Sequence, residues 1–134
     1  HPGKDTFDVT VPIGKVPHRY LKFLYAASPD GKHAHSRVTV LERRAACSLV
    51  RVQIDTGRPH QIRIHMAASG FPLLGDPLYV QGGVPAPGSQ ALPSELGYHL
   101  HNTLLGIRHP AKGTWMEIAC MPPPVLRLCG TAQK

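Results

Sequence analysis

The sequence predicts an α+β domain, mainly antiparallel sheet with one or two helices, and three observations lead to this class. Two pairs of short-linked runs, at residues 35–55 and 98–121, are typical of antiparallel hairpins. Between them, residues 61–69 carry the flanking signals of a helix. The 134 residues are 42% hydrophobic and 17% charged, a globular composition at the length of one domain. We therefore expect a single domain over residues 1–134, with one core.

The first 36 residues are rich in Pro, Gly and Asp and contain one plausible strand. Residues 6–13, TFDVTVPI, predict that strand because Phe7, Val9 and Val11 alternate with other residues. Residues 17–31, PHRYLKFLYAASPDG, fit a short helical face as well as a strand. Periodicity leaves both structures open for this segment.

A hairpin is predicted next, from HSRVTVLER at 35–43 and CSLVRVQID at 47–55, with residues 43–46 as the connection. In the second strand Val50, Val52 and Ile54 share one face, since side chains alternate along a strand. We expect that face to belong to the core.

A helix is predicted over residues 61–69, after the turn DTGRP and before Gly70. Pro59 is tolerated in a first turn, because its missing N–H would have no partner there. Ile62 and Met66 are four residues apart and are expected to face the core. Small residues nearby leave room beside Arg63 for another group to approach.

The remainder predicts loops and a second hairpin. FPLLGDPLY at 71–79 reads as a Pro/Gly-rich loop, and residues 80–97 as a mobile surface loop. The run YHLHNTLLGIRHPAKGTWMEIACMPPP, at 98–124, predicts two strands with HPAKG as their turn. The three prolines end the second strand, because proline cannot continue a central strand.

The charge of the chain suggests a polyanionic partner. Fifteen Lys and Arg against eight Asp and Glu give a net charge of +7, which favours nucleic acid, RNA included. The alternative is a solvated basic face without a ligand.

Other classes are disfavoured. Three cysteines, Cys47, Cys120 and Cys129, form no C-x-x-C pair and argue against a disulfide framework, so we expect an intracellular, reducing compartment. The nine histidines show no H-E-x-x-H pattern, and we expect no metal. No apolar run approaches the roughly 18 residues of a membrane span, and we expect no membrane partner.

The first turn of the predicted helix carries four polar residues that could donate hydrogen bonds to a phosphate, a carboxylate or a base edge. These candidate RNA-binding residues are Arg58, His60, Gln61 and Arg63. The alternative is that they are ordinary surface residues of a basic helix.

TGRPHQIRIHMAASGFPLLGDPLY, at 56–79, closely resembles the signature of the RluA-type RNA pseudouridine synthases, T-G-R-T-H-Q-I-R-V-H followed by G-x-P-[IL]-x-G-D-x-x-Y. YHLHNTLLGIRHPAKG, at 98–113, is similar to a later hairpin of that family. The resemblance spans roughly residues 36–124. It implies a partial pseudouridine synthase fold.

The resemblance also implies a reaction and a site. Enzymes of this family break the glycosidic bond of a uridine flipped out of RNA and rejoin the base through carbon, without a cofactor. Arg63 resembles the residue that pairs with the catalytic Asp of an H-R-L-D motif, and such pairing keeps the Asp ionised. The residues that look like architecture around that site are Thr56, Gly57, Gly75, Asp76 and Tyr79.

The sequence departs from the family in one respect, because no H-R-L-D occurs in these 134 residues. Asp55 and Asp76 are the nearest carboxylates, and we expect neither to be the nucleophile. The family's catalytic-site Tyr is not assigned to Tyr20 or Tyr25. The chain also begins without Met, at His1. We expect the C-terminal half of a catalytic domain, inactive alone and completed by a partner chain, an N-terminal segment or a ribonucleoprotein assembly.

Two functions therefore stay open at this point. The first is part of an RNA pseudouridine synthase acting on structured RNA such as rRNA or tRNA. The second is a non-catalytic RNA-binding or structural subunit of a ribonucleoprotein, such as an organellar ribosome, derived from such an enzyme. The sequence does not separate mitochondrion, chloroplast, cytoplasm and nucleus.

Overall fold

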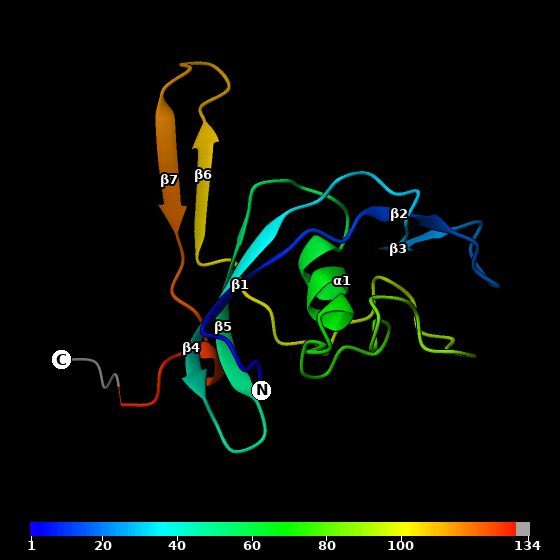
Figure 1. Cartoon of the computed structure of the whole chain (residues 1–134). Coiled ribbons are helices and arrows are strands. Elements are labelled where there is room, and N and C mark those ends of the chain that lie inside the picture. Colours follow the sequence, from blue (N-terminus) through cyan, green and yellow to red (C-terminus); the bar gives the residue numbers. More distant parts are fainter. Residues whose placement is uncertain (131–134) are drawn as a thin grey trace. The chain divides into compact units, whose positions relative to one another are not determined.

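The computed structural model describes residues 1–130, and the chain divides into two compact units, His1–His99 and Leu100 onward (Figure 1). The pattern of antiparallel strands with one α-helix confirms the predicted α+β class. The elements are β1 (Thr6–Val9), β2 (Ile13–Val16), β3 (Leu24–Ala27), β4 (Ser36–Arg43), β5 (Ser48–Ile54), α1 (Gln61–Ala68), β6 (Leu104–Arg108), β7 (Trp115–Ala119) and the 3-10 turn η1 (Pro124–Leu126).

The first unit contains a three-stranded sheet in the order β1-β4-β5, and the predicted β4–β5 hairpin is confirmed. Val38 lies at its centre, opposite Phe7 on one side and Val52 on the other. Val50 and Val52 pack toward the core as expected, whereas Ile54, at the end of β5, is 44% exposed. The alternation therefore predicts the core face in the middle of β5 and fails at both ends, because Leu49, on the opposite face, is buried.

The strand predicted over residues 6–13 is broken into β1 and the start of β2. Pro12 lies at the break, and proline has no N–H to donate to a strand ladder. After the break the chain leaves the three-stranded sheet and pairs with β3 in a separate two-stranded sheet. The ambiguous segment 17–31 thus contains a strand, with Leu24 and Ala26 buried.

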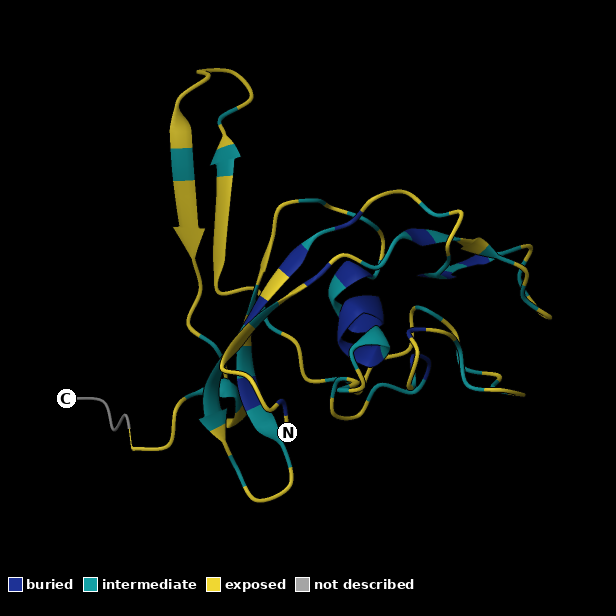
Figure 2. Ribbon diagram, viewed as in Figure 1, coloured by how far each residue is buried: buried dark blue, intermediate teal, exposed yellow. Residues whose placement is uncertain are grey.

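Helix α1 packs against both sheets of the first unit and is mostly buried (Figure 2). Ile64 and Ala67 belong to the core cluster that includes β2 and β3, while Met66 belongs to the cluster beneath β1 and β4. The predicted inward direction of Ile62 and Met66 is confirmed. A helix of this length is marginal in isolation, so its stability comes from this packing.

The helix ends as the sequence predicts. Ser69 is the C-cap, and Gly70 follows with φ 84°, a left-handed conformation that glycine adopts without strain. The N–H of Phe71 then donates to the carbonyl of Met66. These contacts turn the chain sharply away from the helix axis.

Residues 71–99 contain no helix or strand. Within this segment the backbones of Gly75 and Gly97 pack closely against each other. Gly75 has φ 79°, and a Cβ there would lie 2.2 Å from the carbonyl oxygen of Gly97. The N–H of His99 also donates to the carbonyl of Leu74. The two ends of the loop formed by residues 75–97 are therefore in contact, so the loop is closed at its base. The mobility expected for residues 80–97 stays a prediction.

The second unit is built on the predicted hairpin of β6 and β7. The pairs Leu105 with Ile118 and Ile107 with Met116 lie across from each other, so one face of the hairpin is entirely apolar. The turn is closed by the N–H of His109, which donates to the carbonyl of Thr114. Strand β7 ends before the prolines, as expected. Within the described residues no helix has the length and hydropathy needed to cross a bilayer.

Candidate functional site

Arg63 and Asp76 form a buried, two-pronged ion pair in the first unit. Arg63 Nε donates to Asp76 Oδ2 at 2.7 Å, and Nη2 donates to Oδ1 at 2.9 Å. The side chains are 2% and 1% exposed. Such parallel N–H···O bonds fix orientation as well as charge, which a lysine ammonium could not do.

The turn that follows Gly75 positions the carboxylate. Asp76 Oδ1 also accepts hydrogen bonds from the backbone N–H groups of Leu78 and Tyr79, at 2.9 and 3.1 Å. The left-handed Gly75 lets the chain enter this turn. Asp76 therefore organises its own loop and also holds Arg63.

Both members of the pair are charged. Burial alone would raise the pKa of Asp76, but the hydrogen bonds from Arg63, Leu78 and Tyr79 outweigh it, and the net pKa is lowered. Burial would likewise lower the pKa of Arg63, and the bonds to Asp76 raise it overall. A buried ion is tolerated only when its partners satisfy it, as they do here.

Two tyrosines and one carbonyl enclose the guanidinium of Arg63. Its Cζ lies 4.2 Å from the ring centroid of Tyr98 and 4.9 Å from that of Tyr79, within cation–π distance. Nη1 donates to the carbonyl of Pro93 at 2.9 Å. The hydroxyl of Tyr79 donates to the carbonyl of Tyr25 at 2.7 Å, and burial raises the pKa of Tyr79 to about 12.

His60 stands at the N-cap of α1 in an uncommon backbone conformation. With φ 55°, it is the only non-glycine residue in the described chain with a positive φ. Burial, followed by the nearby Arg63 charge, lowers the pKa of His60, so the ring is held neutral. Non-glycine residues in this region are strained and are often found at functional sites.

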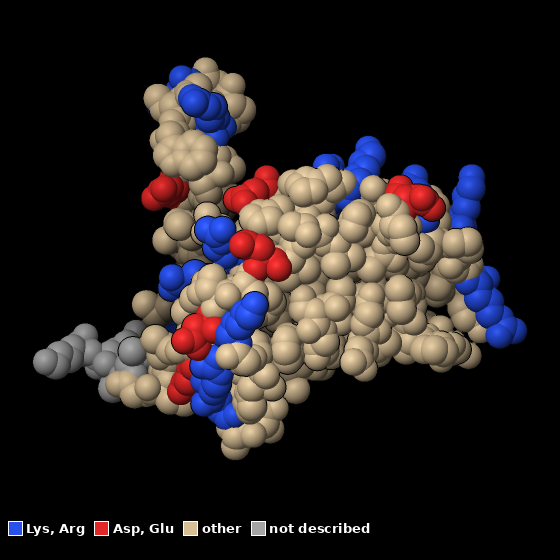
Figure 3. Space-filling model, viewed as in Figure 1, with Lys and Arg blue, Asp and Glu red and all other residues tan. Residues whose placement is uncertain are grey.

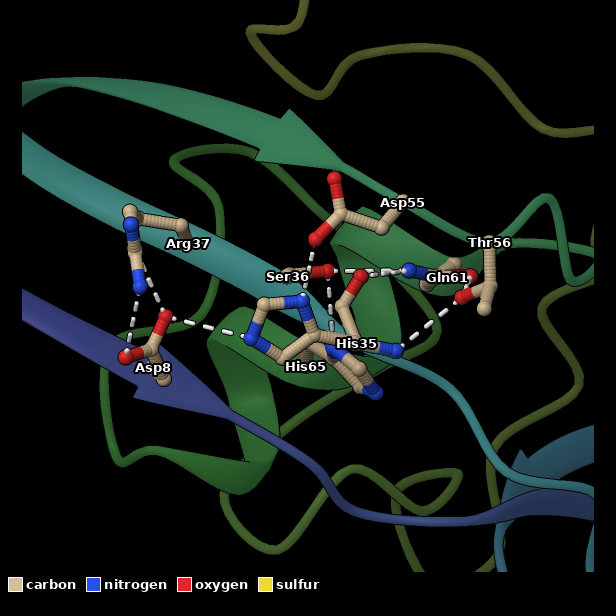
Figure 4. A network of polar contacts seen from close by, with 8 residues as sticks. All are labelled: Asp8, His35, Ser36, Arg37, Asp55, Thr56, Gln61 and His65. Atoms are coloured by element: carbon tan, nitrogen blue, oxygen red, sulfur yellow. Dashed lines mark hydrogen bonds and ion pairs between the residues drawn. The ribbon is translucent and has the colours of Figure 1, made fainter.

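Gln61 is the centre of a buried polar network that joins α1 to β4 and to the turn after β5 (Figure 4). Its Oε1 accepts from Thr56 Oγ1 and from the N–H of Arg58, at 2.8 and 3.0 Å. Its Nε2 donates to the carbonyl of His35 and to Ser36 Oγ, at 2.8 and 3.0 Å. All four hydrogen-bonding positions of the amide are therefore occupied inside the protein.

The network continues to His65, which is fully buried (Figure 4). Its Nε2 lies 2.9 Å from the carbonyl of Val11, to which only an N–H can bond. Burial lowers the pKa of His65, so the ring is neutral and its Nδ1 must accept from Ser36 Oγ, at 2.8 Å. One chain of donors thus runs from Gln61 through Ser36 and His65 to Val11.

His35 lies between two carboxylates at the edge of this network (Figure 4). Its Nδ1 lies 2.6 Å from Asp55 and its Nε2 lies 3.1 Å from Asp8, which Arg37 also contacts. Asp55 is therefore engaged with His35, and Asp76 with Arg63. Asp55 does not contact Arg63, and the Asp76 carboxylate is fully occupied by its hydrogen bonds to Arg63, Leu78 and Tyr79.

The four predicted RNA-binding residues divide into two groups. Gln61 and Arg63 are buried and make internal hydrogen bonds. Arg58 is half-buried, and its Nε donates to the carbonyl of His33. His60 is half-buried, with its ring 5.9 Å from that of Tyr79.

Several contacts of the site are not predictable from the sequence pattern. The Ser36–His65 contact, the stacking of Tyr98 and the carbonyl of Pro93 bring together residues 29 to 35 positions apart, which no local spacing indicates. Among residues 1–130, no group of three or more His, Cys, Asp or Glu side chains is placed to hold a metal ion.

Comparison with known proteins gives consistent matches. Residues 4–68 match the family described as RNA pseudouridylate synthase. The chain is 44% identical over 122 residues to an uncharacterised RNA pseudouridine synthase of Synechocystis, 46% over 123 residues to RNA pseudouridine synthase 5 of Arabidopsis thaliana, and 40% over 116 residues to ribosomal large subunit pseudouridine synthase D of Pseudomonas aeruginosa. These alignments cover 91%, 73% and 81% of the chain, but only 42%, 33% and 35% of the relatives. The chain thus spans less than half the length of these relatives.

Proposed function

Because the chain belongs to the RNA pseudouridine synthase family, we propose that it forms the C-terminal part of an enzyme that isomerises uridine to pseudouridine in structured RNA such as rRNA or tRNA. The observation that carries the proposal is the buried, charged Arg63 between Asp76 and two tyrosines. In this proposal the catalytic Asp of an H-R-L-D motif lies on a segment outside these 134 residues, in the same protein or in a partner.

The guanidinium has donors left for such an Asp. It carries five N–H groups, of which Asp76 and Pro93 account for three. The contact with Pro93 involves a loop that contains no helix or strand, whereas the contacts with Asp76 form the two-pronged ion pair. A carboxylate that reached the remaining N–H groups would be held ionised by the cation. Asp76 would keep Arg63 in place while the second carboxylate acts on the substrate.

The chemistry asked of the site is an isomerisation. The base leaves C1′ of the ribose through N1 and returns through C5, while the hydrogen on C5 is lost to water and N1 gains one. No atom is added or removed overall, so no cofactor is required. The protein would have to position the base and control charge, which a rigid, water-poor cluster supports.

The test uses RNA labelled with tritium at C5 of uridine and the full reading frame that contains this chain. We expect tritium release by the complete protein and background release by Arg63→Lys, because an ammonium cannot form the fork. Arg51→Lys, at an exposed position of β5, is the matched control and should retain the wild-type rate. Urea unfolding of each variant checks that it is folded.

Two outcomes would overturn the proposal. One is a folded Arg63→Lys protein that releases tritium at the wild-type rate. The other is a complete protein that binds RNA without any release, which would favour the non-catalytic RNA-binding subunit instead.

A further inference from the structure

We propose that a basic cavity in the first unit, between the β2–β3 hairpin and the turn that precedes α1, binds a phosphodiester of the RNA strand. The inference rests on the proposed function for the choice of RNA as ligand. The cavity has a volume of about 450 Å³, within the usual range for ligand sites. Its lining includes Lys15, Tyr25, Asp30, Lys32, Gly57 and Arg58.

The lining is electropositive. Lys15, Lys32 and Arg58 contribute three cations, and Asp30 contributes one carboxylate. Within residues 1–130 none of these three cations is in an ion pair. In Figure 3, Lys and Arg side chains stand out at the right of the view, where Figure 1 places β2 and β3. A concave surface lined by one sign of charge attracts the opposite sign.

Arg58 is oriented for an anion. Its Nε donates to the carbonyl of His33 at 2.9 Å, which fixes the plane of the guanidinium. Neither of its Nη groups forms a hydrogen bond to the part of the chain that the structure describes. These two groups can donate side by side to two oxygens of a phosphate.

Close backbone packing fixes the segments that carry Lys15 and Lys32, and the Lys15 ammonium lies 4.0 Å from the ring centroid of Phe23. Lys32 exchanges two backbone hydrogen bonds with Ile13, at 3.0 and 2.9 Å. A Cβ on Gly31 would lie 2.4 Å from the backbone of Ile13, and one on Gly14 would lie 3.0 Å from the Cα of Gly31. The two glycines therefore let the turn pack directly on β2. A preformed site loses little entropy when its ligand binds.

Gly57 is a lining residue without a side chain. Its φ is not positive, and a Cβ at this position would meet nothing within 4 Å. Neither backbone strain nor packing within the described chain explains a glycine here. Gly57 nevertheless lines the cavity, so the missing side chain leaves backbone open to a ligand that approaches closely.

The cavity is connected to the Arg63 cluster. Tyr25, which lines the cavity, accepts the hydroxyl hydrogen bond of Tyr79, whose ring faces Arg63. Arg58 itself lies five residues before Arg63 on the same segment. The cavity and the Arg63 cluster are therefore built partly from the same segments of the chain.

The test measures binding of a fluorescent RNA hairpin by anisotropy at several salt concentrations. The slope of log affinity against log salt is negative, and a substitution that removes one phosphate interaction should decrease its magnitude by about 0.7 to 0.9. We expect that decrease for Lys15→Gln, Lys32→Gln and Arg58→Gln. Lys112→Gln removes the same charge at an exposed site in the second unit and should leave the slope unchanged.

Gly57→Ala gives a second, charge-neutral test. It should weaken RNA binding several-fold while the urea midpoint stays at or above that of the wild type, because alanine restricts the unfolded chain. A wild-type slope in all three charge variants, together with wild-type affinity in Gly57→Ala, would overturn the cavity. If these variants lose affinity but the complete protein releases no tritium, the cavity stands and the proposed function fails.

Discussion

The guanidinium of Arg63 and the carboxylate of Asp76, thirteen positions apart in the chain, face each other through two hydrogen bonds in an almost solvent-free position. The pair connects α1 to the turn after Gly75, and both tyrosines around it contact the same guanidinium. Removal of the ion pair should therefore lower the free energy of unfolding of the first unit.

Asp76→Asn should destabilise the protein strongly. The change leaves a buried arginine without its counter-charge, and breaking a buried pair in this way costs about 3 to 5 kcal/mol. Urea unfolding monitored by circular dichroism measures the loss. Asp8→Asn, which removes the exposed partner of Arg37, is the control and should have a much smaller effect. Equal losses in the two variants would contradict the role given to Asp76.

Ser36→Ala should interrupt the donor chain between Gln61 and His65. Both partners would lose a hydrogen bond in a buried position, with an expected loss of about 1 to 3 kcal/mol in the free energy of unfolding. Ser48→Ala is matched to it, because within residues 1–130 the Ser48 hydroxyl hydrogen-bonds to one side chain, that of the exposed His1. A Ser36→Ala protein as stable as the Ser48→Ala protein would argue against the network.

His65 should make stability depend on pH in acid. Its pKa is lowered from 6.5 in the folded state, so below pH 6.5 the unfolded chain binds a proton that the folded chain does not. The contribution is complete above pH 6.5 and is lost as pH falls through the folded pKa, at up to about 1.4 kcal/mol per pH unit. Urea titrations of wild type and His65→Gln between pH 7.5 and 5 isolate this slope. A slope unchanged by the substitution would be inconsistent with a buried neutral ring.

Gly75→Ala should be more harmful than Gly70→Ala. Both glycines have a similar left-handed φ, 79° and 84°, and alanine there costs about 1 to 2 kcal/mol. Only at position 75 does the new Cβ collide with another group, the carbonyl of Gly97, whereas at position 70 it meets nothing within 4 Å. The difference between the two urea midpoints measures the collision, and identical midpoints would show that the loop base is not closed.

The hairpins and the helix were predictable because their signals are local. The strands β4 and β5, the strands β6 and β7, and the limits of α1 follow from alternation, turn residues and Gly70. The break at Pro12 shows where alternation alone fails, since Val11 continues the pattern although the chain changes sheets. The strand β3 does not follow from its own residues, because its burial depends on partners supplied by other segments.

The candidate site was less predictable for a related reason. Polar residues in a first helical turn usually face solvent, whereas Gln61 and Arg63 point inward to partners that arrive from β4 and from the loop after α1. A sequence pattern records the spacing along the helix but not these distant acceptors. The family signature identified the segment, and only the fold shows which of its members remain accessible.

Because all four hydrogen-bonding positions of the Gln61 amide are occupied, few other side chains fit at this position. A glutamate has the same outline, but it would aim an acceptor at the His35 carbonyl, which can only accept. A leucine is similar in size, but it would leave Thr56, the Arg58 N–H, the His35 carbonyl and Ser36 without this hydrogen-bond partner. The position thus requires the two different ends of an amide, an acceptor toward Thr56 and Arg58 and a donor toward His35 and Ser36.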